Sequence, residues 1–288
     1  TLGQIIPPSI VLIILGDVFR VPVGDLFSAA VWPGLGLVAA YIIFILIVSY
    51  FKKDMAPAIP KDPSRGSKMK QVIKALIDII PSLTLILFVL GSIFAGIATP
   101  TESSAIGCLG AVLLAVAYRS FSMDMVKEAA FESVKVTSMV FAILIGATAF
   151  SMVFTYTGGD EIVEHFMMNL PGDEKIAFIL FTMLAIFILG FFIDFVEISY
   201  IIVPILVPIA MNLDINPVWF AILIAMNLQT SFLTPPFGFA LFYLKGVVPD
   251  SVRTIDIYKG VLPFIFIQVA VLLLLVFYPE IFGISSSM

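Results

Sequence analysis

Two proline pairs, Pro7-Pro8 and Pro235-Pro236, lie inside apolar stretches near opposite ends of this 288-residue chain. Proline lacks the backbone N–H donor and clashes with the preceding helical turn, so each pair should break a helix near its middle. A short polar loop and another long apolar segment follow each pair. Broken helices at corresponding places in two halves of a membrane protein are the best sequence indication of a binding site inside the bilayer.

The composition excludes a soluble globular domain. Hydrophobic residues make up 61% of the chain and charged residues only 12%. In a typical soluble domain about a quarter of all residues are charged. Apolar stretches long enough to cross a hydrocarbon core of about 30 Å recur along the chain. We therefore predict an all-α polytopic membrane protein embedded in the lipid bilayer. No basic patch with interleaved aromatic residues indicates nucleic-acid binding.

Hydropathy and the positions of Pro and Gly divide the chain into two repeats joined by a linker. The first repeat covers residues 1–51, with the end of a broken helix at 3–18 and a span at 31–51. A polar cytoplasmic linker is predicted at 52–71. The second repeat, 72–288, holds spans at 72–97, 101–118, 136–156 and 258–282, an amphipathic helix at 122–135, an acidic loop at 159–174, a re-entrant hairpin at 175–212 and a broken helix at 217–244. Because the chain opens at the first break, we expect it to be part of a longer protein.

The distribution of Lys and Arg predicts the orientation of these segments. Thirteen of the 15 basic residues lie in three connections, within 52–74, 119–135 and 245–259, and an excess of Lys and Arg marks the cytoplasmic side. The stretch 175–212 then starts outside, and the broken helix after it crosses once and ends inside. The stretch itself must therefore cross the bilayer twice or not at all. Gly190 and Asp194 in its middle favour a re-entrant hairpin or a pair of short helices. The two broken helices consequently run in opposite directions, as in the inverted repeats of secondary transporters.

Polar residues precede the second proline pair on one face of its helix. Spacings of 3, 4 and 7 residues place them one above another. Unwound backbone carbonyls and Ser and Thr hydroxyls together offer the oxygen ligands that hard cations such as Na⁺ require. Alternatively, the hydroxyls only satisfy the carbonyls that the proline kink frees. The residues concerned are Asn227, Thr230, Ser231 and Thr234, followed by Pro235, Pro236 and Gly238.

The predicted hairpin carries two acidic residues, Asp194 and Glu197, beyond Gly190. Ionisable groups at membrane depth are costly and are usually functional, so this pair could bind a cation or a proton. Alternatively, Asp194 caps the second helix of the hairpin by accepting its free backbone donors.

The run Thr99-Pro100-Thr101-Glu102 favours a helix start. Thr99 suits the N-cap position, Pro100 the first helical position, and Glu102 completes a capping box three residues after the cap. We therefore interpret these four residues as a structural cap.

Four motifs together resemble those of a known family, the large membrane subunit of the tripartite ATP-independent periplasmic (TRAP) transporters. They are Gly-Ile-Ala-Thr-Pro-Thr-Glu-Ser-Ser-Ala at 96–105, Gly-Phe-Phe-Ile-Asp at 190–194 with Pro-Ile-Leu-Val-Pro at 204–208, Thr-Pro-Pro-Phe-Gly at 234–238 after Asn227, and Ile-Pro-Pro-Ser at 6–9. The resemblance covers the chain from end to end in order and spacing. Two positions depart from the family pattern, because glycine usually stands at position 231 and a small residue at position 197.

The resemblance implies a bacterial inner-membrane, multi-pass, Na⁺-coupled symporter that imports organic acids by an elevator motion. It also implies three kinds of partner, namely a small four-helix membrane subunit, a periplasmic substrate-binding protein and a carboxylate substrate. It assigns Gly190 and Asp194 to the second hairpin, and Na⁺ to the region of Ser231, Thr234 and Gly238. Residues of the two breaks complete the implied site: Pro7, Pro8 and Ser9 in the first, and Asn227, Thr234, Pro235, Pro236 and Gly238 in the second.

Three other functions compete with this interpretation. One is a stand-alone Na⁺/carboxylate symporter that needs no binding protein. Another is an intramembrane hydrolase using Asp194 and Glu197, although paired acids work face to face rather than as neighbours on one helix. The third is a purely structural membrane scaffold. The sequence contains no Walker-type nucleotide-binding loop, and we predict a transporter that is not an enzyme and needs no cofactor besides Na⁺ as coupling ion.

Overall fold

The computed structural model describes residues 2–52, 68–235, 238–249 and 252–287. Its described elements are helices, with one isolated bridge between Ile215 and Ser287. Six of these helices are long and apolar enough to cross a membrane, which confirms the prediction of an all-α polytopic membrane protein. The chain divides into two compact units, Thr1–Ile42 with Val136–Met288, and Ile43–Lys135. The re-entrant hairpin and the inverted repeat stay predictions.

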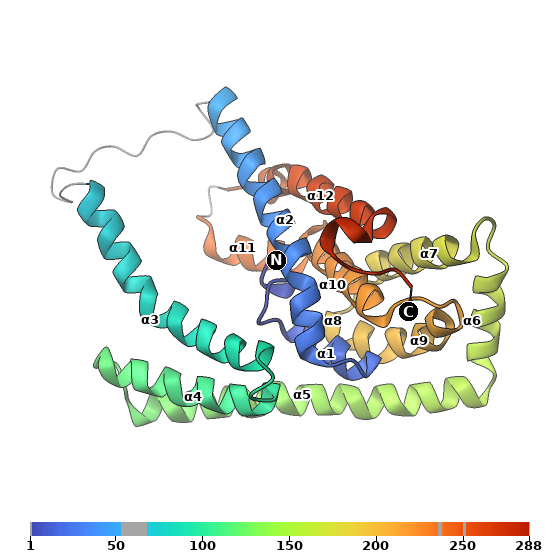
Figure 1. Cartoon of the computed structure of the whole chain (residues 1–288), viewed down its shortest axis with the longest axis horizontal. Helices are drawn as coiled ribbons and strands as arrows, with labels where there is room; N and C mark the ends of the chain where they lie inside the picture. Colours follow the sequence, from blue (N-terminus) through green and yellow to red (C-terminus); the bar gives the residue numbers. More distant parts are fainter. Residues whose placement is uncertain (1, 53–67, 236–237, 250–251, 288) are drawn as a thin grey trace. The chain divides into compact units, whose positions relative to one another are not determined.

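The first unit contains both proline breaks and the segment between Gly190 and Asp194 (Figure 1). Before Ile42 it holds η1 (Leu2–Gln4), α1 (Ile10–Phe19) and the start of α2 (Val23–Phe51). After Val136 it holds the end of α5 (Met123–Tyr156), α6 (Gly159–Met168), α7 (Glu174–Leu189), α8 (Phe195–Glu197), the π-helical η4 (Ile198–Ile202), α9 (Val203–Asn212), α10 (Pro217–Leu233), α11 (Phe239–Val247), α12 (Thr254–Phe277) and η5 (Pro279–Phe282).

Helix α10 forms the core of this unit. Every residue from Trp219 to Phe232 is buried, because α10 packs against α1, α7 and α12 on different sides. Phe220 contacts the rings of Phe19 and Phe178, at centroid distances of 5.7 and 5.6 Å. The indole Nε1 of Trp219 donates a 2.9 Å hydrogen bond to the backbone oxygen of Leu275 in α12. Most residues of α10 up to Met226 are apolar, and a helix that is hydrophobic nearly all round is expected to be buried.

The second unit contains α3 (Lys68–Phe94), α4 (Pro100–Ala117) and the first part of α5. Figure 1 shows α3 changing direction partway along its length, and Pro81 lies inside this helix, where a missing N–H donor permits a kink. Helices α3 and α4 pack together, with the hydroxyls of Ser92 and Ser103 2.8 Å apart between them. A Cβ on Gly107 would lie 3.3 Å from Val89 Cγ2, so this small residue lets α4 approach α3.

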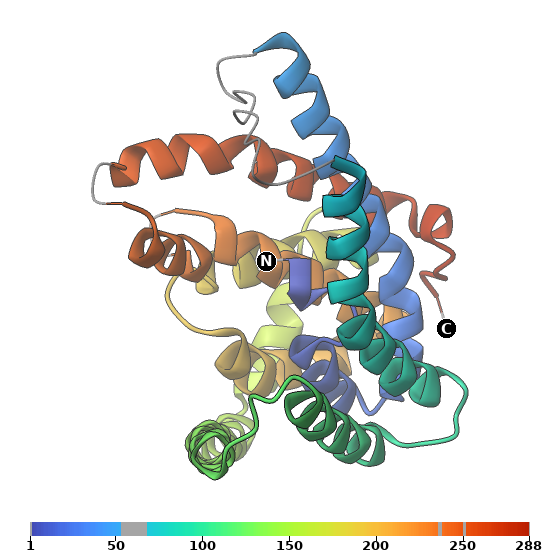
Figure 2. The ribbon, with the colours of Figure 1, turned by 90° about the vertical axis from the view of Figure 1, so that its left-hand side faces the viewer.

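Three boundaries differ from those predicted by the sequence. Helix α2 begins at Val23 rather than near residue 31 and continues through Pro33. Residues 123–156 form the single helix α5 instead of separate helices at 122–135 and 136–156; Figure 2 views α5 nearly end-on, as an uninterrupted green coil. The acidic segment predicted as a loop contains α6. Of the predicted linker 52–71, residues 53–67 lie outside the described residues.

The start of α4 has the geometry of a capping box. Thr99 Oγ1 accepts a hydrogen bond from the backbone N of Glu102 at 3.3 Å, and Glu102 Oε2 accepts one from the backbone N of Thr99 at 2.8 Å. Pro100 and Thr101 occupy the first two positions of the helix. Residues 99–102 therefore form the start of α4, as the sequence motif indicates.

We expect Thr99→Ala to lower the thermal stability of the detergent-purified protein, because the N-cap acceptor is lost. Loss of an N-cap hydroxyl typically costs about 1 kcal/mol. Thr101→Ala is the matched control, since it removes the same hydroxyl two residues later, inside the helix. Melting temperatures of the two variants test the assignment; equal values for both would contradict a capping role for Thr99.

Candidate functional site

The second break separates α10 from α11. Thr234 has extended backbone angles (φ −94°, ψ 128°) and ends α10, while α11 begins at Phe239. A Cβ on Gly238 would lie 2.7 Å from the backbone oxygen of Phe232 and 2.9 Å from that of Thr234. Only glycine fits this close approach, which gathers backbone carbonyl oxygens at the break. Pro235 precedes Gly238 in this turn, and Pro236 lies outside the described residues.

The hydroxyls before the break all bond to carbonyls of their own helix. Thr234 Oγ1 donates to Thr230 O, Thr230 Oγ1 to Met226 O and Ser231 Oγ to Leu228 O, each at 2.8 Å. These bonds match the alternative raised from the sequence, in which the hydroxyls satisfy backbone carbonyls near the proline break. A hydroxyl that donates its proton keeps its oxygen lone pairs, so the same groups can still ligate a cation.

Asn227 joins the second broken helix to α7. Its side chain is 1% exposed, and Nδ2 donates a 2.7 Å hydrogen bond to the backbone oxygen of Met183. A buried polar side chain is tolerated in an apolar surrounding when it is hydrogen-bonded. Asn227 therefore ties two helices together.

The segment between α7 and α8 forms a tight polar tip. Gly190 ends α7, and Asp194 is the N-cap of α8, with Oδ1 accepting a 2.8 Å hydrogen bond from the backbone N of Phe195. Asp194 thus takes the capping role that the sequence left open. The Oε2 atom of Glu197 is enclosed and has no hydrogen-bond partner among the described residues.

Gly190 packs directly on the second broken helix. A Cβ on Gly190 would lie 2.7 Å from the Cβ of Ser231 and would also overlap its hydroxyl. Ser231 is completely buried. The tip between α7 and α8 and the second break therefore meet at a contact in which one residue must be glycine.

The first break lies between η1 and α1. The Pro7-Pro8 peptide bond is cis, and Ser9 is the N-cap of α1, with Oγ accepting a 3.3 Å hydrogen bond from Leu12 N. The Ser9 hydroxyl also donates to the backbone oxygen of Gln4. These bonds place η1 beside the start of α1, and the two elements also contact α10.

A cavity of about 570 Å³ opens where the three segments meet. Its described lining consists of Gly3 and Gln4 from the first break, Asp194 and Phe195 from the tip between α7 and α8, and Phe232, Ala240 and Tyr243 from the second broken helix and α11. Among the described site residues predicted from the sequence, Asp194 is the one in this lining. Several other described members of the predicted set end, cap or pack the neighbouring helices. Sequence analysis missed Gln4, although a lone amide in the apolar run before Pro7-Pro8 was a usable signal.

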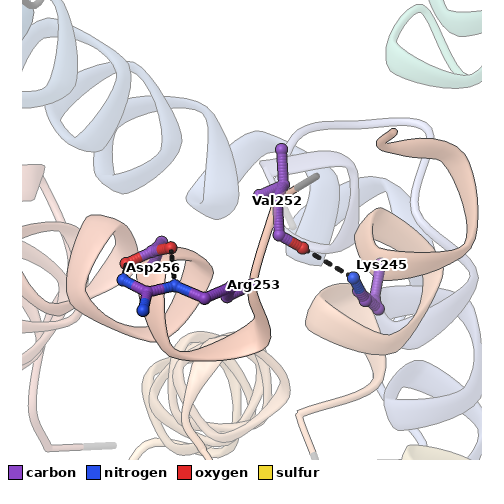
Figure 3. A network of polar contacts seen from close by, with 4 residues as sticks. All are labelled: Lys245, Val252, Arg253 and Asp256. Carbon is purple, nitrogen blue, oxygen red and sulfur yellow. Dashed lines mark hydrogen bonds and ion pairs between the residues drawn. The ribbon is translucent and has the colours of Figure 1, made fainter. Parts of the chain in front are cut away.

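Two polar contacts lie at the described ends of the segment between α11 and α12 (Figure 3). Lys245 Nζ donates a 2.6 Å hydrogen bond to the backbone oxygen of Val252. The guanidinium of Arg253 binds the carboxylate of Asp256 through two bonds of 3.0 and 3.1 Å. Lys245 is two residues from Tyr243 in sequence, but its ammonium is engaged with this segment.

Comparison with known proteins agrees with this architecture. Residues 1–281 match the model of the family described as "Tripartite ATP-independent periplasmic transporter, DctM component". The chain is 30% identical to the sialic acid TRAP transporter large permease protein SiaM of Vibrio cholerae, with 97% of this chain and 63% of the relative aligned. It is 29% identical to the C4-dicarboxylate TRAP transporter large permease protein DctM of Pseudomonas aeruginosa, over 98% of this chain and 64% of the relative.

A third relative is the isethionate TRAP transporter permease protein DctMQ of Oleidesulfovibrio alaskensis, 30% identical over 97% of this chain and 43% of its own length. The chain thus spans somewhat less than two thirds of the relatives it matches. The family match nevertheless extends over nearly all of its residues, including both breaks and the cavity. The chain belongs to the DctM component family of the tripartite ATP-independent periplasmic transporters, a family of multi-pass membrane permeases.

Proposed function

We propose that this chain forms the transport unit of a Na⁺-coupled importer of organic carboxylates in the bacterial inner membrane. The substrate reaches it from a periplasmic binding protein, and a small four-helix membrane subunit accompanies it. The observation that carries the proposal is a cavity whose described lining comes from two helix breaks and from the tip between α7 and α8. In transporters, such breaks supply free backbone groups at the depth where substrate and ion bind.

The second break provides the chemistry for a monovalent cation. Carbonyl oxygens of Phe232 and Thr234 crowd around Gly238, and the Thr234 hydroxyl keeps its lone pairs. Oxygen dipoles of this kind can replace the hydration shell of an ion. A Na⁺ bound here would attract the carboxylate of a substrate in the adjoining cavity and offset the negative charge of Asp194.

Coupling between the ion and the substrate follows from the packing. Ser231 contacts Gly190 at the hairpin tip, and Asn227 binds α7. An ion that orders the end of α10 would therefore also order the tip that lines the cavity. Each Na⁺ that moves inward releases about 2.3 kcal/mol of free energy per 100 mV of membrane potential. This free energy drives accumulation of the substrate by an elevator motion of the transport unit.

Uptake by proteoliposomes tests the proposal. The full-length permease, its small subunit and the binding protein are reconstituted, and radiolabelled acids are offered with a gradient of either Na⁺ or K⁺. We expect uptake only with Na⁺ and only with the binding protein. Equal uptake with K⁺ would overturn Na⁺ coupling, and uptake without the binding protein would favour a stand-alone symporter.

We expect Thr234→Val to raise the Na⁺ concentration for half-maximal uptake by about three- to tenfold, because one oxygen ligand worth about 1 kcal/mol is lost while the shape is kept. Thr148→Val is the matched control, since Thr148 Oγ1 makes the same 2.8 Å bond to a carbonyl four residues earlier, in α5. An unchanged Na⁺ dependence of Thr234→Val would remove this hydroxyl from the ligands.

A further inference from the structure

Helix α2 is packed into the first unit along only part of its length. Its buried residues follow one another at short helical spacings, and they are Leu26, Phe27, Ala30, Pro33, Gly34, Leu37 and Tyr41. Residues 42–51 of the same helix are all partly or fully exposed, and the first unit itself ends at Ile42. Tyr41 is therefore the last buried residue of α2 before the chain passes into the second unit.

Tyr41 contacts α12. Its ring meets the ring of Phe264 edge to face at a centroid distance of 5.0 Å, and its hydroxyl interacts with the side chain of Gln268, one turn further along α12. Both helices are long and apolar enough to cross a membrane. Polar side chains on neighbouring membrane helices are expected to hydrogen-bond across the contact, so Tyr41 and Gln268 are natural partners.

The polar part of this contact is loose in the present conformation. Gln268 is completely buried and Tyr41 is 9% exposed. The Tyr41 hydroxyl and both amide atoms of Gln268 nevertheless reach hydrogen-bond geometry with none of the described residues. Buried polar groups without a hydrogen bond cost free energy. A small displacement of α2 against α12 would let the hydroxyl and the amide pair, and this would remove the cost.

We propose that Tyr41 and Gln268 form a latch between α2 and α12, open in the present conformation and closed by a hydrogen bond at another stage of the transport cycle. This inference rests on the proposed function, since it specifies how α2 is held on the unit that carries both breaks. A conformation that loses this bond is less populated, and the steps that pass through it slow accordingly. Neither residue is in the described lining of the cavity, so both are positioning residues.

Uptake by the reconstituted full-length permease, with its small subunit and its binding protein, tests the latch. The acids offered are radiolabelled succinate, sialic acid and isethionate. Tyr41→Phe removes the hydroxyl and keeps the ring, and Gln268→Met removes the amide at similar length. We expect each variant to lower the maximal uptake rate about three- to fivefold, as for the loss of one hydrogen bond between membrane helices. The half-saturating concentrations of Na⁺ and of the acid should stay as in the wild type.

Melting temperatures of the detergent-purified variants separate the latch from a structural tie. Because the hydroxyl and the amide are unpaired in the present conformation, removal of either should leave the melting temperature equal to or above that of the wild type. Tyr50→Phe is the matched control, since it removes a hydroxyl from the exposed end of the same helix. This control should change neither the uptake rate nor the melting temperature.

The double variant Tyr41→Phe/Gln268→Met should be no slower than the slower single variant, because both single changes remove the same bond. Slowing by the product of the two single effects would overturn the pairing, and unchanged uptake rates would overturn the latch. Lower melting temperatures in both single variants would show a bond that is already closed, which also overturns the latch. Wild-type uptake that is absent or independent of Na⁺ would instead sink the proposed function, and the melting temperatures would still decide whether the contact is open.

Discussion

Gly190→Ala is expected to abolish Na⁺-dependent uptake and to destabilise the permease by about 2 kcal/mol, a typical cost of overpacking. The new methyl group would lie 2.7 Å from the Cβ of Ser231, well inside van der Waals contact. Rotation of the serine hydroxyl cannot relieve this overlap, because the Cβ position is set by the backbone of α10. The tip between α7 and α8 would have to move away from the second break.

Second-site variants make this prediction specific. Ser231→Gly removes the opposing Cβ and should restore uptake to Gly190→Ala, whereas Ser231→Ala keeps the Cβ and should not. Gly260→Ala in α12 is the control, since a Cβ there would have no neighbour within 4 Å. Uptake rates and melting temperatures of these variants measure the effect. Full activity of Gly190→Ala alone would show that the contact is not required.

Asn227→Asp is expected to have an effect of similar size on folding. The substitution is nearly isosteric, but it replaces the Nδ2 donor with an oxygen facing the backbone oxygen of Met183 at 2.7 Å. An uncompensated charge at a buried site costs about 3–5 kcal/mol. We therefore expect a sharp loss of folded protein on size-exclusion chromatography and a much lower melting temperature.

Asn216→Asp is the matched control for this substitution. Asn216 is the N-cap of the same helix, and its Oδ1 accepts hydrogen bonds from Val218 N and Trp219 N at 2.9 and 3.3 Å. Aspartate accepts these bonds equally well, so the control should fold normally. Similar melting curves for Asn227→Asp and the wild type would contradict the inferred role of Asn227 as a tie between α10 and α7.

Local signals in the sequence predicted the features of this fold that depend on a few neighbouring residues. Proline pairs indicate both breaks because they remove backbone donors wherever they occur. The spacing of Thr99, Pro100 and Glu102 predicts the capping box because its bonds join residues three positions apart. The boundaries in α2 and α5 were wrong because a helix can absorb Pro33, and because the change from polar to apolar residues near 135 does not interrupt backbone hydrogen bonding.

The candidate site was predicted less completely, since a cavity depends on contacts between distant segments. Asn227 and Ser231 are predicted to lie near a ligand, which stays a prediction, and nothing in the sequence indicates that their side chains contact α7 and Gly190. Gln4, Phe232 and Tyr243 line the cavity, but each looks unremarkable within its own segment. Their convergence follows only from the packing of η1, α1 and α11 around the end of α10.

The complete enclosure of α10 restricts how this protein can work. A helix whose residues from Trp219 to Phe232 are all covered cannot slide or rotate by itself, because every such movement would open gaps against α1, α7 and α12. Close-packed interiors transmit displacement rather than absorb it. In the transport cycle proposed above, the second break would therefore move together with α1, α7 and α12 as one body.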